Sequence, residues 1–177
     1  MLTRLTPLNG EAILPLDECK IHLQITHSDE DVVLRAMRDA AISHVERVSG
    51  VALALGDYRW TLPRFTGALS LPVRPVHALT SVSYTDAAGA AATYPDARLM
   101  DGAIYPASGA AWPYAAGYVS VVFEAGLQDP SDEPGLLQAA LMQLSILEDR
   151  GRSDEKTINA MRDCVAALIG THQQIMA

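Results

Sequence analysis

The chain has 177 residues, of which 49% are hydrophobic, with a formal net charge of −8 and a pI near 4.9. This length and apolar content predict one domain, residues 1–177, with a real core, and they exclude a disordered chain. The acidic balance without a basic run argues against wrapping nucleic acid, and no stretch approaches the roughly 20 apolar residues that span a bilayer.

The first third of the chain is predicted to be helical after an extended arm over residues 1–14. Residues 15–50 carry the start and stop signals of a helical hairpin. Asp17 is a good N-cap for a short first helix, Ser28 is one for a long second helix, and Gly50 is suited to the left-handed end of that helix. Helical spacing predicts the apolar face of the second helix from Val33, Met37, Ala41, His44 and Val48.

The middle of the chain, residues 56–125, is predicted to be a small antiparallel β unit. Apolar and polar residues alternate in several short runs, most clearly from Tyr118 to Glu124. Asp101 and Gly102 form the strongest short hairpin signal in the chain. The turn signals between the runs are typical of short strands.

Two further helices are predicted within residues 133–170, the second capped by Ser153 and ended by Gly170. The apolar stripe of the last helix is formed by Ile158, Met161, Val165, Leu168 and Ile169. A polar tail, residues 171–177, follows. The order of helices, strands and helices predicts an α+β fold: a helical hairpin at the N-terminus, a small antiparallel β unit in the middle and two helices at the C-terminus.

Two groups of residues could hold a metal ion. Cys19 and His22 stand one helical turn apart, but no second pair completes a four-ligand zinc site, so a buried thiol beside an ordinary histidine is the better interpretation. Residues 29–31 (DED) could form a cation site, but their place at the start of a helix favours compensation of the helix dipole. His44 is interpreted as a packed or interfacial residue.

No sequence motif points to catalysis. The chain lacks a Gly-rich phosphate loop, a G-x-S-x-G elbow and an H-E-x-x-H motif. We therefore predict no catalytic residue, cofactor or metal site, and a protein that acts through its surfaces. Cys19 and Cys164 are isolated and form no disulfide framework, which fits assembly in a reducing cytoplasm.

The order of these segments resembles the head–tail connector proteins (adaptor or head-completion proteins) of long-tailed phages and of phage-derived gene transfer agents. Residues 16–25 (LDECKIHLQI) are similar to the family's L-x-x-x-K-x-H-L-R-[IV] start, with Gln24 where Arg is usual. Further similar segments are the acidic run 29–31, the Pro-rich turn 71–76 (LPVRPV), the strand 79–86 (LTSVSYTD), the strand 119–123 (VSVVF) and the helix 137–150 ending in EDR. The family often has an aromatic residue at the position of Leu147.

The resemblance implies a non-enzymatic virion protein at the head–tail junction, assembled in the bacterial cytoplasm. It implies a ring, expected to be dodecameric, below the portal protein, with stopper or terminator proteins on its tail side. DNA is expected to pass through this ring without specific binding, and no membrane is involved. We expect the C-terminal segment to dock on the portal through Ile169, Thr171, His172, Gln173, Gln174, Ile175 and Met176. The first alternative is a tail-terminator or stopper protein of the same assembly. The second, which the sequence favours less, is a small metal-dependent enzyme.

Overall fold

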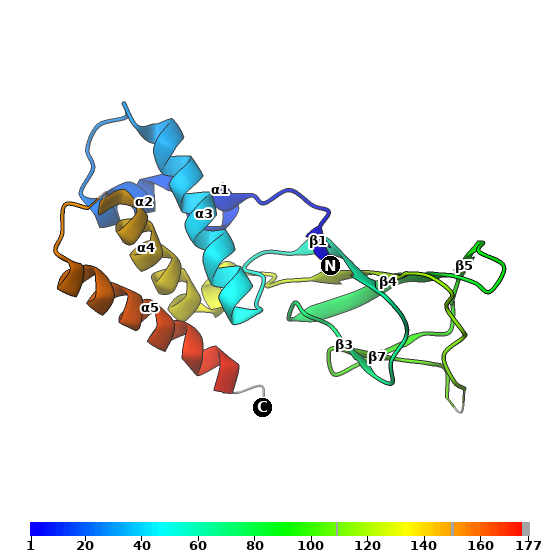
Figure 1. Ribbon diagram of the computed structural model, residues 1–177. Coiled ribbons are helices and arrows are strands. Elements are labelled where there is room, and N and C mark those ends of the chain that lie inside the picture. The colour runs from blue at the N-terminus through cyan, green and yellow to red at the C-terminus, as the bar shows by residue number, and fades with distance from the viewer. Residues whose placement is uncertain (109, 150, 175–177) are drawn as a thin grey trace. The chain divides into compact units, whose positions relative to one another are not determined.

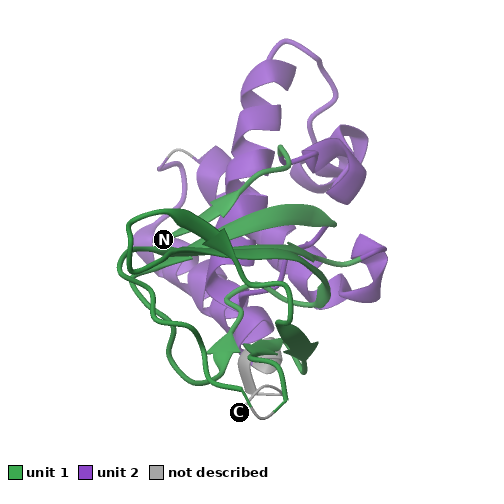
Figure 2. Ribbon diagram, turned by 90° about the vertical axis from the view of Figure 1, so that its right-hand side faces the viewer, with its two compact units in different colours: residues 1–7, 55–127 green, residues 8–54, 128–177 purple. Residues whose placement is uncertain are grey.

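The computed structural model describes residues 1–108, 110–149 and 151–174, and the chain forms two compact units (Figures 1 and 2). The first, which we call the β unit, consists of residues 1–7 and 55–127. The second, the helical unit, consists of residues 8–54 and 128–177. The predicted α+β fold, with helices first, antiparallel sheets in the middle and two helices last, is confirmed.

The β unit contains a five-stranded sheet of order β1-β2-β8-β4-β5 and a three-stranded sheet of order β3-β7-β6. Every strand pair is antiparallel. The strands are β1 Leu2–Arg4, β2 Gly56–Leu62, β3 Leu69–Ser70, β4 Val76–Thr85, β5 Ala91–Thr93, β6 Arg98–Met100, β7 Ala103–Tyr105 and β8 Val119–Ala125.

The central strand β8 follows the predicted alternation. Val119, Val121 and Phe123 are fully buried, and the Phe123 ring stacks on that of Tyr58 in β2 at a centroid distance of 5.8 Å. Such cross-strand aromatic pairs add to the stability of a sheet beyond the burial of area. The core of the β unit therefore rests on the strand with the clearest alternation.

The hairpin predicted at Asp101 and Gly102 joins β6 to β7. Both residues have positive φ angles, 50° and 70°, as a two-residue turn of type I′ requires. A second turn joins β4 to β5, where the Asp86 carboxylate accepts hydrogen bonds from the backbone N–H groups of Ala88 and Ala90, both at 2.9 Å. The Asp101–Gly102 signal is confirmed.

The N-terminal segment is not extended throughout, so the expected arm over residues 1–14 needs correction. Its first residues form β1, which pairs with β2 in a register that sets Leu2 opposite Trp60. Residues Gly10–Ile13 form the short helix α1, and the side chain of Asn9 accepts a hydrogen bond from the N–H of Ala12 at 3.3 Å. An unpaired edge of β2 and a local N-cap thus order both halves of the segment.

The helical unit is built around α4, which contacts α2, α3 and α5. Its helices are α1 Gly10–Ile13, α2 Leu16–Leu23, α3 Asp31–Ser49, the 3₁₀ turn η1 Pro130–Asp132, α4 Pro134–Asp149 and α5 Glu155–Gln174. Every α-helix contributes at least one buried apolar side chain to the core of this unit. These side chains include Ile13, Leu16, Ile42, Val45, Leu136, Leu144, Val165 and Ile169.

The helix starts differ from those predicted by one or two positions. The N-cap of α2 is Pro15, and Asp17 lies in the first turn. Helix α3 begins at Asp31, and the carbonyl of Ser28 rather than its hydroxyl accepts the Asp31 N–H, at 3.2 Å. Acidic side chains in a first turn stabilise the helix dipole even when they are not caps. The predicted end of α3 at Gly50 is confirmed by its φ of 73°.

The last helix also differs from the prediction at both ends. The Asp154 carboxylate accepts the Thr157 N–H at 2.8 Å, as an N-cap does, whereas the Ser153 hydroxyl donates to Asp149 at 2.7 Å. Helix α5 continues through Gly170 to Gln174, so the tail begins later than predicted. A glycine inside a helix costs only about 1 kcal/mol, which does not stop a helix whose other residues favour it.

The buried face of α3 is rotated by about one position from the predicted stripe. Val33 and Val48 are 43% and 41% exposed. The buried residues are Leu34, Arg38, Ala41, Ile42, Val45 and Ser49. The predicted stripe did not include Arg38, which is buried with its charge paired to Glu11 and Asp39 inside the helical unit.

Candidate interaction surfaces

A buried arginine fixes the N-terminal segment of the helical unit. Arg38 is 4% exposed; its Nη1 donates to Oε2 of Glu11 at 2.5 Å, and its Nε donates to Oδ1 of Asp39 at 3.0 Å. The hydrogen bond from Arg38 holds the pKa of the Glu11 carboxyl below its usual 4.5. Gly10 leaves room for this pair, because a Cβ there would lie 1.9 Å from the same Asp39 oxygen. The cluster is structural, since its charges satisfy one another.

Cys19 and His22, the pair considered as metal ligands, do not share a site. Cys19 is fully buried, and this burial raises the pKa of its thiol to about 11. His22 is exposed, with Nε2 2.9 Å from Oγ of Ser145 in α4. Among the side chains that the structure describes, no group of three or more His, Cys, Asp or Glu is arranged to hold a metal ion.

The junction of α2 and α3 is acidic with two exposed aliphatic side chains. Lys20 and Asp31 form an ion pair at 2.5 Å, and Ile21 and Val32, which follow them in sequence, are 78% and 77% exposed. The carboxylates of Asp17, Glu18, Asp29 and Glu30 are exposed in the same two segments. We call this the acidic end of the helical unit. Asp31 lies in the first turn of α3, as dipole compensation predicts.

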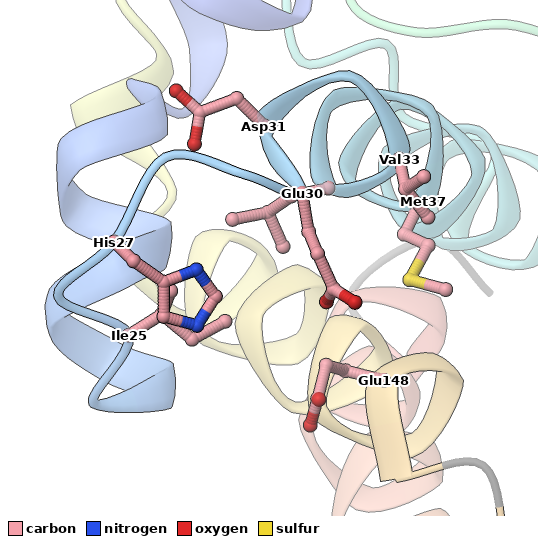
Figure 3. Close-up of a pocket in the computed structure, with 8 residues that line it drawn as sticks. Ile25, His27, Glu30, Asp31, Val33, Met37 and Glu148 are labelled. Carbon is pink, nitrogen blue, oxygen red and sulfur yellow. The ribbon is translucent and has the colours of Figure 1, made fainter.

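A small pocket near this junction is too small for an organic ligand. Figure 3 shows Glu30 directed toward Glu148 of α4, with His27 on one side and Met37 on the other. Its volume of about 10 Å³ has room for a single water. Glu148 pairs with Arg152 one turn further on. The pocket therefore offers no substrate site.

A shallow groove runs along the second half of α3, where α3 faces α4 and α5. It consists of two hollows of about 430 and 280 Å³ that share His44 and Gln143. The lining comprises Ala40, Ser43, His44, Arg47, Val48, Gln143, Leu147, Arg162, Val165, Ala166 and Ile169, with no carboxylate among them. We call this the basic groove. His44 is half-buried, with its Nδ1 3.4 Å from Nη2 of Arg47.

In the β unit an aromatic cluster orders the long loops. The Trp112 ring stacks on Phe65 at 4.7 Å, and its Nε1 donates to the carbonyl of Gly67 at 2.6 Å. Tyr114 and Tyr118 lie beyond this cluster and are 76% and 71% exposed. Exposed tyrosines are frequent in protein interfaces. The alternation around β8 places Tyr118 on the opposite face from the buried Val119, whereas no sequence signal distinguished Tyr114 from the buried aromatic residues.

The charge of the chain is divided unevenly between the units. The β unit has five basic and five acidic residues, whereas the helical unit has eight basic and sixteen acidic ones. The whole net charge of −8 therefore belongs to the helical unit. None of the described helices is long and apolar enough to cross a membrane.

The residues expected to dock on the portal fall into three groups. Ile169 is 2% exposed and belongs to the core of the helical unit. Thr171, His172, Gln173 and Gln174 extend α5. Ile175 and Met176 lie outside the described residues. Ile169 thus anchors α5 in the core of the helical unit, before the residues that are expected to contact the portal.

Comparison with known proteins gives a family and a fold. The family model described as Phage gp6-like head-tail connector protein matches residues 14–92. Three solved structures are similar to 97% of this chain over 94% of theirs. They are the neck of an empty GTA particle computed with C6 symmetry (29% identity, TM-score 0.78), the virion of a native gene transfer agent (GTA) particle (28%, 0.77) and the neck of a native GTA particle computed with C12 symmetry (28%, 0.76). No curated protein sequence matches significantly.

The family match covers the helical hairpin and the first strands, and the structural similarity extends over nearly the whole chain. The similar structures come from the neck and the virion of GTA particles, which is the kind of particle that the sequence resemblance implied. The family consists of structural proteins, so the alternative of a metal-dependent enzyme is set aside. Residues 14–92 thus match the phage gp6-like head-tail connector family, and the whole chain is similar in structure to components of gene transfer agent particles.

Proposed function

We propose that the protein forms a dodecameric ring between the portal and the tail-side proteins of a gene transfer agent or a related phage particle. The observation that carries this proposal is the similarity of 97% of the chain to a component of a neck computed with C12 symmetry. A ring of identical subunits requires a head-to-tail contact between two different surfaces of the same chain. The helical unit offers two surfaces of opposite character for that contact.

The C-terminal segment, residues 171–177, docks on the portal in this proposal, and the opposite side of the ring faces a stopper or terminator protein. The segment follows a helix that is held by Val165 and Ile169, both buried in the helical unit. These two side chains thus hold the helix that leads into the segment.

DNA passes through the ring without specific binding in this proposal. The helical unit has twice as many acidic as basic residues, and the β unit is electrically balanced. A passage that is acidic or electrically balanced does not attract the phosphates of DNA, and this allows the duplex to slide. A basic lumen in a solved ring would contradict this part of the proposal.

The experiment is affinity purification of the tagged chain from its producing cell, followed by mass spectrometry of the co-purifying proteins. Portal and tail proteins together are the expected result. Tail proteins without the portal favour the stopper or terminator alternative, and a chain that purifies alone contradicts both. Deletion of residues 171–177 should abolish recovery of the portal while the thermal midpoint stays within a few degrees, and unchanged recovery refutes the docking segment.

A further inference from the structure

The basic groove differs in charge from the rest of the helical unit. That unit has a large excess of acidic residues, yet the groove contains Arg47 and Arg162 and no carboxylate. Each hollow pairs one arginine with one exposed aliphatic side chain: Arg47 with Leu147, which is 37% exposed, and Arg162 with Val48, which is 41% exposed. The polar side chains of His44 and Gln143 line both hollows. Two cations, each beside an aliphatic side chain, fit a partner with exposed aliphatic side chains flanked by carboxylates.

The acidic end of the same unit has this composition. Ile21 and Val32 are the two most exposed aliphatic side chains of the helical unit among the residues that the structure describes. Lys20 is neutralised by its ion pair with Asp31. The exposed carboxylates that neighbour this pair therefore give the surface a negative charge. Exposed Ile and Val side chains within an acidic surface are typical of a docking site rather than of a solvated face.

The two exposed aliphatic positions on α3 are far apart within one chain. Val32 is the second residue of α3, while His44, Arg47 and Val48 lie in its last turns. At 1.5 Å per residue, Val32 and Val48 are separated by about 24 Å along a straight helix. The two surfaces are complementary in charge and distinct in position, which is the requirement for a heterologous contact that repeats from copy to copy.

We propose that the acidic end of one copy docks into the basic groove of the next copy, and that this contact closes the ring. The inference rests on the ring proposed above and assigns its interface. In this contact Ile21 and Val32 cover Val48 and Leu147, and the carboxylates of Asp17, Glu18, Asp29 and Glu30 face Arg47 and Arg162. The contact joins two different surfaces, so every copy contributes its acidic end to one neighbour and its basic groove to the other.

Crosslinking tests this contact within assembled particles. In a Cys164→Ser background, the pair Ile21→Cys and Val48→Cys places one thiol on each surface, both at exposed positions. A short bismaleimide reagent should give a ladder of dimers, trimers and higher species. The matched control is the pair Ile21→Cys and Val32→Cys, both on the acidic end, which should give no ladder. If the first pair gives none in particles that contain the chain, the interface is wrong although the ring proposal stands; a chain missing from the particles contradicts the ring itself.

Charge reversal gives an independent measurement. Replacement of Arg47 and Arg162 by Glu should lower the amount of chain per particle at least tenfold, as should replacement of Glu18 and Asp29 by Lys. The two reversals combined in one chain should restore incorporation, because each interface then has its charges exchanged. Unchanged incorporation in the separate variants, or no recovery in the combined one, overturns the proposed contact. A thermal midpoint near that of the unchanged protein verifies that each variant folds.

Discussion

Arg38 and Glu11 are 27 positions apart in sequence, and their side chains meet at 2.5 Å between α3 and α1. The guanidinium is 5% exposed, whereas the carboxylate is 59% exposed. One partner is therefore buried and depends on the other, together with Asp39, for its compensation. This pair connects the segment before the family match to the longest helix within it.

Replacement of Arg38 by Ala should lower the free energy of unfolding by about 3 kcal/mol. The variant loses the packing of the side chain and its ion pairs with Glu11 and Asp39. Urea unfolding measured at neutral pH tests this value. Arg35→Ala is the matched control on the same helix. The Arg35 side chain is 50% exposed, and its ion pair with Asp31 is long, at 4.0 Å. Its effect should be below about 0.5 kcal/mol. Equal effects of the two variants would contradict the structural role of Arg38.

Gly10→Ala and Gly170→Ala should change stability in opposite directions. A Cβ at Gly10 would lie 1.9 Å from Oδ1 of Asp39 and 2.8 Å from Nε of Arg38, so the ion-pair cluster must move, at a cost of about 1–3 kcal/mol. A Cβ at Gly170 meets nothing within 4 Å and lies inside α5, where alanine should stabilise by up to about 1 kcal/mol. Thermal midpoints of the two variants measure the difference. A destabilised Gly170→Ala variant would contradict the helical continuation.

The two cysteines should differ in reactivity. Cys164 is exposed, and Cys19 is fully buried with the pKa of its thiol raised to about 11. A thiol-specific reagent at pH 8 should therefore modify one thiol per chain in the native protein and two in denaturant. Rapid modification of both thiols in the native protein would contradict the burial of α2 against the core.

The same thiol makes stability depend on pH in the alkaline range. The folded state holds the Cys19 proton more tightly than the unfolded state, whose thiol has the ordinary value of 9.0. This contribution is therefore complete below pH 9 and is lost as the pH rises toward about 11. Urea unfolding at several pH values should show a steeper alkaline decline for the unchanged protein than for Cys19→Ala. Cys164→Ala is the control and should keep the steep decline.

Trp112 should contribute to the stability of the β unit more than its exposed neighbours do. Trp112→Ala removes the stacking on Phe65 and the hydrogen bond to Gly67, and should cost about 2–3 kcal/mol. Tyr114→Ala should cost less than about 0.5 kcal/mol, because Tyr114 is 76% exposed. Chemical unfolding of both variants gives the comparison. A neutral Trp112→Ala would show that the loops are ordered by other contacts.

Local sequence signals were sufficient where each side chain has a fixed direction. In β8 the alternation alone identified Val119, Val121 and Phe123 as core residues, and the positive φ angles of Asp101 and Gly102 follow from the Asp-Gly signal. The apolar stripe of α5 was also correct at Val165 and Ile169. In these elements the period of the pattern and the burial agree.

The predictions failed where a distant residue decides the outcome. No local pattern predicts the burial of Arg38, because its partner Glu11 lies 27 positions away in a segment expected to be extended. The buried face of α3 includes Arg38, whereas Val33 and Val48 are exposed. The basic groove was missed for the same reason, because Arg47 and Arg162 belong to different helices and only the fold brings their surroundings together.

The most direct test of the connector assignment is cryo-electron microscopy of the neck of particles purified from the producing cell. We predict twelve copies of the chain in one ring between the portal and the tail-side proteins, with residues 171–177 on the portal and the acidic end of each copy in the basic groove of the next. A neck reconstruction that contains no density for this chain would contradict the assignment.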